Sequence, residues 1–185
     1  MASTVISSFW HLFDFISFKY IKYHVIKAFL CAFQVEHYNN LTLKSIHTLK
    51  LLLLLYPKST KFLVKIDDDS FLNLPRIANV LLNASLDESS LQMFGILAEK
   101  SVAFYPKDEK EKQEKYLRKW KTATYMYNQT YNPKHMSGSC YIMTYPAAQC
   151  LLKKSMDILY YHMEDVFVTG FAANACNITK VNLEG

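Results

Sequence analysis

The sequence predicts an α/β fold, and three features lead to that prediction. A short apolar run, residues 62–66, is followed at once by three aspartates. A run this short and this rich in β-branched and aromatic residues is typical of a buried strand in a parallel sheet. A helical pattern and a turn precede the run. Helix, turn, strand and acidic loop in this order make one half of a parallel α/β unit.

The helix before the acidic strand is predicted over residues 40–56. Asn39 or Asn40 can cap its start, apolar residues recur at helical spacing, and Pro57 follows its end. Residues 51–55 are apolar all round, which indicates burial of the last turn. The chain then has a short turn before the strand.

Further elements are expected after the acidic triplet. We predict helices over residues 75–83 and 146–161, strands over residues 91–97 and 141–143, and irregular tyrosine-rich chain over residues 125–131. Gly95 weakens the first of these strands because glycine adds no side chain to a sheet. Small residues at 137–140 precede the second strand and allow the backbone to approach a neighbouring strand or a ligand closely.

Length and charge limit the class of protein. The chain has 185 residues, enough for one domain with a core, and 51% of them are hydrophobic, which excludes intrinsic disorder. The net charge of +5 is modest, and no basic stretch lacks acids, so we expect no nucleic-acid partner. The densest charge run, residues 107–121, places acids four residues before bases, which predicts a solvated helical face.

The first 33 residues are atypical. They are rich in aromatic residues, but Asp14 and several lysines and histidines interrupt every apolar run before it reaches the ~20 residues of a spanning helix. Nothing basic precedes the apolar stretch, so a cleavable signal peptide fits poorly. We therefore predict a buried or interfacial segment at residues 1–33 and a separate domain at residues 34–185.

Cysteines and glycosylation sequons give weaker signals. The four cysteines lack zinc-site spacing and are compatible with one or two disulfides or with buried thiols. Asn-x-Ser/Thr sequons begin at Asn40, Asn83, Asn128 and Asn177. Such sequons are glycosylation acceptors only in secreted chains, so they agree with a luminal location.

The acidic triplet points to a metal. Asp67, Asp68 and Asp69 repel one another, and a fold keeps such charges close when a cation offsets them. Mg²⁺ and Mn²⁺ prefer carboxylate oxygen and commonly bridge to phosphates. A solvated acidic turn is the alternative. An EF-hand is excluded because Phe71 and Leu72 occupy the next ligand position and the glycine position of that loop.

A second acidic pair, Glu164 and Asp165, precedes an apolar segment that has the pattern of a helix start. A helix cap is the ordinary role of such a pair. A catalytic carboxylate is the other interpretation, because general bases are often Asp or Glu at the end of an element.

Five segments in this order resemble the β-1,3-galactosyltransferase family of Golgi glycosyltransferases. They are Asn-Leu-Thr-Leu-Lys from Asn40, Lys-Ile-Asp-Asp-Asp-Ser-Phe-Leu-Asn from Lys65, Lys-Trp at 119–120, Ser-Gly at 137–138 with Tyr141, and Glu-Asp-Val-Phe-Val-Thr-Gly from Glu164. The resemblance runs from about residue 34 to about residue 170. It implies a GT-A (Rossmann-like) fold for nucleotide-diphospho-sugar transfer, present here as a partial catalytic domain.

The resemblance also implies how a donor would bind. The donor would be a UDP-sugar, with Mn²⁺ (or Mg²⁺) as cofactor held by the acidic motif. Asp69 would coordinate the metal between the donor phosphates. Asp67 or Asp68 would contact the ribose or assist the metal.

The resemblance assigns the chemistry to the second acidic pair. Asp165 matches the family position of the general base, which takes a proton from an acceptor hydroxyl so that UDP is displaced with inversion. Glu164 would be its neighbour in the site. Trp120, Ser137 and Gly138 are similar to segments that line the donor and acceptor cleft, with packing as the alternative role for Trp120.

The resemblance implies a hexosyltransferase that moves galactose or N-acetylglucosamine from a UDP-sugar to an acceptor glycan, in protein or lipid glycosylation. Family members are membrane-anchored on the luminal side of the Golgi apparatus, whereas this chain shows no clear anchor.

The chain departs from the family in three places, and the two at its ends suggest a shortened fold. Residues 1–33 stand where the family has its first nucleotide-binding portion, Cys140 replaces a second glycine, and the chain stops at Gly185. We expect strands beside the acidic strand to be unpaired. The alternative function is a catalytically silent relative that at most binds metal or a partner.

Overall fold

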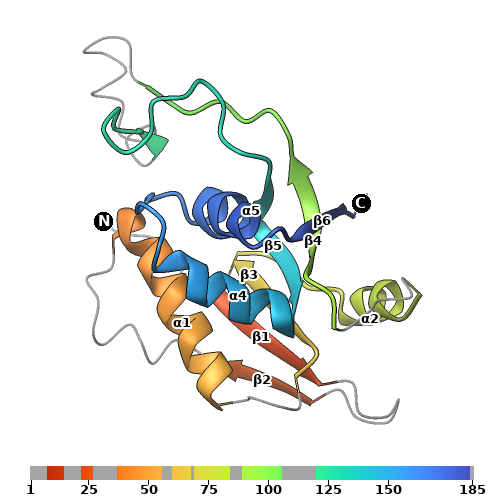
Figure 1. The fold of residues 1–185 in the computed structure, drawn as a ribbon. Helices are drawn as coiled ribbons and strands as arrows, with labels where there is room; N and C mark the ends of the chain where they lie inside the picture. The colour runs from red at the N-terminus through yellow and green to blue at the C-terminus, as the bar shows by residue number, and fades with distance from the viewer. Residues whose placement is uncertain are drawn as a thin grey trace, which may run out of the picture.

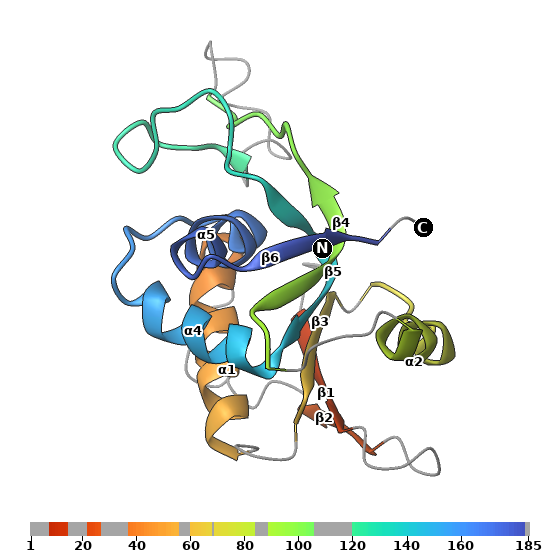
Figure 2. The same ribbon diagram turned by 45° about the vertical axis from the view of Figure 1, so that its right-hand side comes forward.

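The computed structural model describes residues 8–14, 22–26, 37–55, 60–67, 69–83, 89–105 and 120–183. Within them a mixed sheet has helices on both faces, which confirms the expected α/β class (Figures 1 and 2). The strands are β1 (Ser8–Asp14), β2 (Lys22–Ile26), β3 (Phe62–Asp67), β4 (Gln92–Ala98), β5 (His135–Thr144) and β6 (Thr179–Asn182). The helices are α1 (Leu41–Leu55), α2 (Leu74–Asn83), α4 (Tyr145–Ser155) and α5 (Ala173–Ala175), with a 3₁₀ turn η2 (Tyr38–Asn40) and a π-helical turn η4 (Val166–Ala172).

Most predicted elements are confirmed, within about two residues at their ends. The predicted helix over residues 40–56 is α1, the acidic strand is β3, and residues 75–83 and 91–97 correspond to α2 and β4. Residues 125–131 are irregular, as expected. The His37 imidazole accepts the Asn39 N–H at 3.1 Å and caps the turn η2, which directly precedes α1. Capping of α1 by Asn39 or Asn40 stays a prediction. Of the charged helix predicted over residues 107–121, residues 107–119 lie outside the described part of the chain.

Two predicted boundaries are wrong. Residues 137–140 lie inside β5 rather than before it, because their backbone belongs to the ladders with β3 and β4. The helix expected over residues 146–161 ends at Ser155. Its periodicity continues in the sequence, but the Tyr161 carbonyl accepts a hydrogen bond from Thr42 in α1 at 2.9 Å instead of taking part in a helix.

The direction of the acidic strand was also predicted wrongly. The strand order is β2-β1-β3-β5-β4-β6, and β3 runs antiparallel to both β1 and β5. Among the described strands, only β4 and β6 pair in parallel. The apolar run of β3 reflects burial on both faces of the sheet, which a central antiparallel strand shares with a parallel one.

The expectation of unpaired strands beside β3 is likewise wrong. Residues of β1 pair with β3 in register from Ser8 opposite Asp67 to Phe13 opposite Phe62. Part of the atypical first 33 residues therefore extends the sheet. The division into residues 1–33 and 34–185 stays a prediction.

Two apolar cores lie on opposite faces of the sheet. Leu63, Met93 and Met143 pack with α1 and α4 on one face, whereas Val64 and Phe94 pack with α2 on the other. Alternating side chains along β3 thus serve both layers. At Gly95 the strands β4 and β5 come so close that a Cβ would lie 3.2 Å from the Cys140 carbonyl oxygen, so the glycine permits this approach. No helix of the described residues has the length and apolar character needed to cross a membrane.

A disulfide joins Cys150 of α4 to Cys176, directly after α5. Cys140 is a free thiol, and Cys31 lies outside the described residues. The disulfide ties the segment that follows the second acidic pair to the helix layer, across a separation of 26 residues.

We predict that Cys150→Ser lowers the free energy of unfolding by about 3 kcal/mol, because the disulfide restricts the unfolded chain over a loop of this length. Urea unfolding with and without reductant measures the loss. Cys140→Ser is the control and should have a much smaller effect. A Cys150→Ser variant as stable as the oxidised wild type would show that this bond contributes nothing.

Candidate active site

The acidic motif lies at the end of the central strand. Asp67 is the last residue of β3. Asp69, two residues later, has an exposed side chain. Asp68 lies outside the described residues. The Asp67 carboxylate is already engaged, because it forms an ion pair with the ammonium group of Lys65. Lys65 is only 2% exposed. The two described carboxylates of the motif therefore differ, Asp67 being held by the protein and Asp69 facing solvent.

The Lys65 ammonium connects three distant segments. It contacts Asp67 in its own strand and donates to the carbonyl oxygen of Gly138 in β5. Its Nζ lies 3.8 Å from Oε2 of Glu164 and 5.7 Å from the centre of the Tyr141 ring. The sequence predicted that the acidic triplet, the Ser-Gly segment and the Glu-Asp pair share a site, and Lys65 places residues of all three together.

The electrostatics around Lys65 favour bound protons. Burial alone would lower the pKa of Lys65, but the neighbouring Glu164 and Asp67 outweigh it and raise this pKa. Burial, with a contribution from Asp165, raises the pKa of Glu164 despite the nearby lysine. The causes differ: neighbouring carboxyl groups raise the pKa of Lys65, whereas burial is the main cause for Glu164. The Tyr141 hydroxyl donates to Oε1 of Glu164 at 2.5 Å, and burial followed by Glu164 raises the pKa of Tyr141 well above its usual value.

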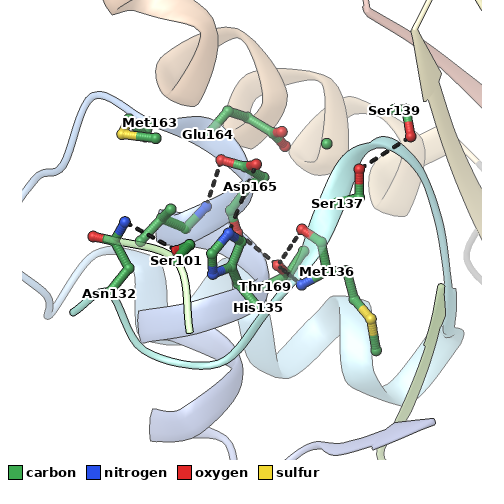
Figure 3. Close-up of polar contacts among 12 residues, drawn as sticks. Ser101, Asn132, His135, Met136, Ser137, Ser139, Met163, Glu164, Asp165 and Thr169 are labelled. Atoms are coloured by element: carbon green, nitrogen blue, oxygen red, sulfur yellow. Dashed lines mark hydrogen bonds and ion pairs between the residues drawn. The ribbon is translucent and has the colours of Figure 1, made fainter. Parts of the chain in front are cut away.

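Asp165 is held at the start of η4 (Figure 3). Its Oδ1 accepts the Val166 N–H at 2.8 Å, so the expected capping role is confirmed. This contact leaves Oδ2 directed toward β5, where it lies 4.0 Å from Nε2 of His135. The side chain is 27% exposed, so a substrate hydroxyl can reach it. Capping and base catalysis are therefore compatible in this residue.

Thr169 and Gly170 fix the position of η4 against β5. The buried Thr169 hydroxyl donates to the Asp165 carbonyl oxygen at 2.6 Å and accepts the Met136 N–H at 2.7 Å (Figure 3). A Cβ on Gly170 would lie 2.9 Å from Cγ of Pro133, too close for any other residue without displacement. The Thr-Gly end of the quoted motif thus has a structural reason, because it lets Asp165 lie beside β5.

His135 is a site residue that the sequence analysis missed. It is buried at the first position of β5, and its Nδ1 donates to the Pro133 carbonyl oxygen at 2.8 Å. This hydrogen bond places a proton on Nδ1 and leaves Nε2 facing Asp165. A lone histidine ahead of a small-residue segment gave no signal by itself, because its partner is 30 positions away in the chain.

The expected cleft residues lie near the acids. Gly138 faces Asp165, since a Cβ built on it would be 3.4 Å from Oδ2 of that residue. Ser137 exchanges a hydrogen bond with Ser139 at 3.1 Å. Trp120 is 37% exposed, and its indole N–H donates to the hydroxyl of Tyr38.

Tyr38 connects Trp120 to the carboxyl groups. Burial, followed by the charge of Asp165, raises its pKa, with smaller contributions from Asp67 and Glu164. Trp120 therefore lies at the border of the acidic site. The cleft-lining roles of Trp120, Ser137 and Gly138 stay predictions.

The predicted sequons differ in accessibility. Asn128 and Asn177 are exposed, whereas Asn40 is half-buried at the end of η2. The hydroxyl of Thr42, the third residue of the Asn40 sequon, donates into the protein interior. The side chain of Asn83 lies outside what the structure describes. Glycosylation at all four positions stays a prediction.

The described residues allow a test of fit for a metal. They contain no group of three or more His, Cys, Asp or Glu side chains that would form a complete protein cage. Mg²⁺-type ions do not need one when a substrate is present, because one or two carboxylates, phosphate oxygens and water complete the shell. Exposed Asp69 suits this mode, and Asp67 is the weaker candidate because Lys65 competes for its carboxylate. The donor set thus fits a substrate-bridging cation, and metal binding itself stays a prediction.

Comparison with known proteins identifies the family. The Galactosyltransferase family model matches residues 27–184. The chain belongs to the galactosyltransferase family. This galactosyltransferase-family chain is also 26% identical over 154 residues to β-1,3-galactosyltransferase bre-2 of Caenorhabditis elegans. The match covers 80% of this chain and 40% of that relative, so the chain spans less than half of the relative's length. The mixed sheet with helices on both faces is consistent with a partial GT-A-like domain, and the resemblance inferred from the sequence is confirmed.

We predict that Lys65→Met lowers the free energy of unfolding by about 3–5 kcal/mol, because it leaves carboxylates in and beside the core without a counter-charge. Chemical denaturation measures the loss. Lys134→Met is the matched control, since its ion pair with Glu99 is 62% and 54% exposed, and it should leave stability unchanged within error. Equal effects of the two substitutions would refute the role assigned to Lys65.

Proposed function

We propose that the chain is the catalytic part of a hexosyltransferase that moves galactose or N-acetylglucosamine from a UDP-sugar to a hydroxyl of an acceptor glycan, with inversion. Family membership supports glycosyl transfer in general. The proposal of hexosyl transfer rests on one observation: Lys65 brings residues of the two acidic motifs together. Lys65 contacts Asp67 of the first motif and lies 3.8 Å from Glu164 of the second. Asp165, beside Glu164, is thereby brought to the same region as the donor motif.

Asp165 is proposed as the general base. It takes the proton from the acceptor hydroxyl, whose oxygen then forms a bond to the anomeric carbon of the donor sugar as the bond to UDP breaks. A single displacement of this kind inverts the anomeric configuration. The contact with Val166 N–H fixes the carboxylate, and its partial exposure allows the acceptor to approach. His135, whose Nε2 faces Oδ2 at 4.0 Å, is proposed to stabilise the carboxylate charge when the imidazole is protonated on both nitrogens.

The donor phosphates are proposed to bind beside Asp69. A Mn²⁺ or Mg²⁺ ion bound there would offset the negative charge that develops on the departing UDP. Asp69 would be its main protein ligand, with Asp67 and Asp68 assisting or contacting the ribose. Lys65 keeps Asp67 in place and neutralises part of the charge of the three surrounding carboxyl groups.

The luminal side of the Golgi apparatus membrane is the proposed location. Three observations support an oxidising, glycosylating compartment: the disulfide between Cys150 and Cys176, the exposed sequons at Asn128 and Asn177, and the family itself. Disulfides are rare in the reducing cytosol, which makes the first of these the strongest.

A second candidate is a silent relative that binds a metal or a partner without transfer. The engagement of Asp67 by Lys65 favours it, since one carboxylate of the donor motif is partly occupied. The two candidates differ in turnover, so measurements of binding and of transfer separate them.

Asp69→Ala tests the donor site. Calorimetric titration of UDP into the chain should give binding that depends on Mn²⁺, and the substitution should abolish it because the exposed ligand is removed. Asp157→Ala, at another exposed aspartate, is the control and should bind as the wild type does. Mn²⁺-dependent binding that survives Asp69→Ala would remove Asp69 from the metal site.

Asp165→Asn tests the base. Transfer from UDP-galactose and UDP-N-acetylglucosamine to a panel of glycans should fall by about 10²–10⁴, because the amide cannot accept the proton. UDP binding should be unchanged, and nuclear magnetic resonance of the product gives its anomeric configuration. Unchanged turnover would exclude Asp165 as base. Binding of UDP by the wild type without any transfer would favour the silent relative.

A further inference from the structure

A separate cavity is lined by residues that stand close in the chain to Tyr38, Trp120 and Glu164. It has a volume of about 510 Å³, and its lining includes Asn39, Asn40, Lys121, Tyr125, Tyr160 and His162. These residues come from η2, directly before α1, from the segment that follows Trp120, and from the segment just before Glu164. The volume is within the ~300–1,000 Å³ of small-molecule sites. Nothing in the roles assigned above uses this cavity.

Three buried hydrogen bonds and one exposed one hold the lining segments together. The Thr42 hydroxyl donates to the carbonyl oxygens of Tyr161 and His162 at 2.9 and 3.1 Å, which fixes α1 to the segment just before Glu164. The hydroxyls of Thr122 and Tyr161 form a hydrogen bond of 2.9 Å, which fixes the segment after Trp120 to the segment before Glu164. The Tyr160 hydroxyl donates to the Asn39 carbonyl oxygen. The cavity is therefore a preformed feature of the fold and not a gap between loosely packed segments.

The lining chemistry suits a sugar. Tyr125 is 81% exposed, so its ring is available to stack on the apolar C–H face of a pyranose. Amide, ammonium and imidazole groups next to it are able to bond sugar hydroxyls. Among the described lining residues there is no carboxylate, so neither a metal ion nor a cationic ligand is favoured.

The position of the cavity relates it to the acceptor. Two of the lining segments start directly after residues that contact each other: Asn39 follows Tyr38, and Lys121 follows Trp120. The third lining segment ends at His162, two residues before Glu164. The chain thus links the cavity lining to Tyr38 and Trp120, and Tyr38 lies close enough to Asp165 for that charge to raise its pKa.

We propose that this cavity is a saccharide-binding subsite that holds an inner sugar unit of the acceptor glycan while the terminal unit reacts. The proposal rests on the proposed function and deepens it. Tyr125 stacks on the inner sugar, and the side chains of Asn39 and Lys121 bond its hydroxyls. The subsite favours acceptors of two or more sugar units over monosaccharides.

A second source of sugar lies close by. Asn40 is part of the cavity lining and begins a sequon, so an N-linked glycan on Asn40 would occupy the same space. The chemistry of recognition is the same in both cases. Asn40→Gln separates the two sources because it removes the attachment point.

The experiment measures saccharide binding directly. Saturation-transfer nuclear magnetic resonance and calorimetry with the full chain use lactose and N-acetyllactosamine as disaccharides and methyl β-galactoside as the monosaccharide. UDP with Mn²⁺ is titrated separately. Tyr125→Ser and Asn39→Ala remove lining groups at the surface, and Asn39→Ala leaves the backbone contact with Tyr160 intact. Tyr131→Ser is the matched control, since Tyr131 is 57% exposed and does not line the cavity.

The expected result is tighter binding of the disaccharides than of methyl β-galactoside. Tyr125→Ser should weaken disaccharide binding at least tenfold, Asn39→Ala should weaken it less, and Tyr131→Ser should leave it unchanged. UDP binding should not change in any of the three variants. Circular dichroism checks that each variant is folded.

The subsite would be overturned if the wild type bound no disaccharide, or if Tyr125→Ser bound it as tightly as the wild type does. It would also be overturned if Tyr131→Ser weakened disaccharide binding as much as Tyr125→Ser. Loss of UDP binding in Tyr125→Ser would assign the cavity to the nucleotide instead. Disaccharide binding gained only by Asn40→Gln would assign the cavity to the chain's own glycan and overturn its acceptor role. Failure of the proposed function is recognised differently, as absent UDP binding and transfer in the wild type.

Discussion

The ammonium group of Lys65 lies almost fully buried between the end of β3, the Gly138 carbonyl oxygen of β5 and the Glu164 carboxylate. A buried charge is costly unless it is paired and hydrogen-bonded, so these three segments must stay together for the protein to fold. The tyrosine hydroxyl on Glu164 completes the network. Stability and the arrangement of the acidic groups therefore have a common origin, because the contacts that neutralise the lysine also assemble the candidate site.

The second acidic motif depends on a different set of contacts. Asp165 is placed by η4, and η4 is placed by the hydroxyl of Thr169 and by the missing side chain of Gly170. The result is a carboxylate with one oxygen held by a backbone N–H and the other facing His135. Preorganisation of this kind is what a general base requires, because its geometry is set before the substrate arrives.

The sheet explains why these groups converge. Strand β3 is central, with β1 and β5 as antiparallel neighbours, and helices cover both faces (Figure 2). The pairing of β1 gives β3 a neighbour on the side away from β5, so the acidic motif does not sit on an open sheet edge. The segment that joins α4 to Glu164 also contributes Tyr160 and His162 to the cavity, so neighbouring parts of the chain build the proposed saccharide subsite and the second acidic motif.

The sequence by itself determined the strand at residues 62–66, the acids that follow it, and the family. An apolar run, the order of residues and the spacing of motifs can all be read directly from the chain. It also predicted α1 and α2, whose ends are marked by proline and asparagine. Only the tertiary structure decided the antiparallel direction of β3, since burial on both faces gives the same apolar pattern in either orientation. Likewise, the pairing of His135 with Asp165 and the cavity lined by Tyr125 join residues that are far apart in the chain. Such contacts leave no periodic trace in the sequence, because they are set by how the layers pack and not by the properties of any one segment.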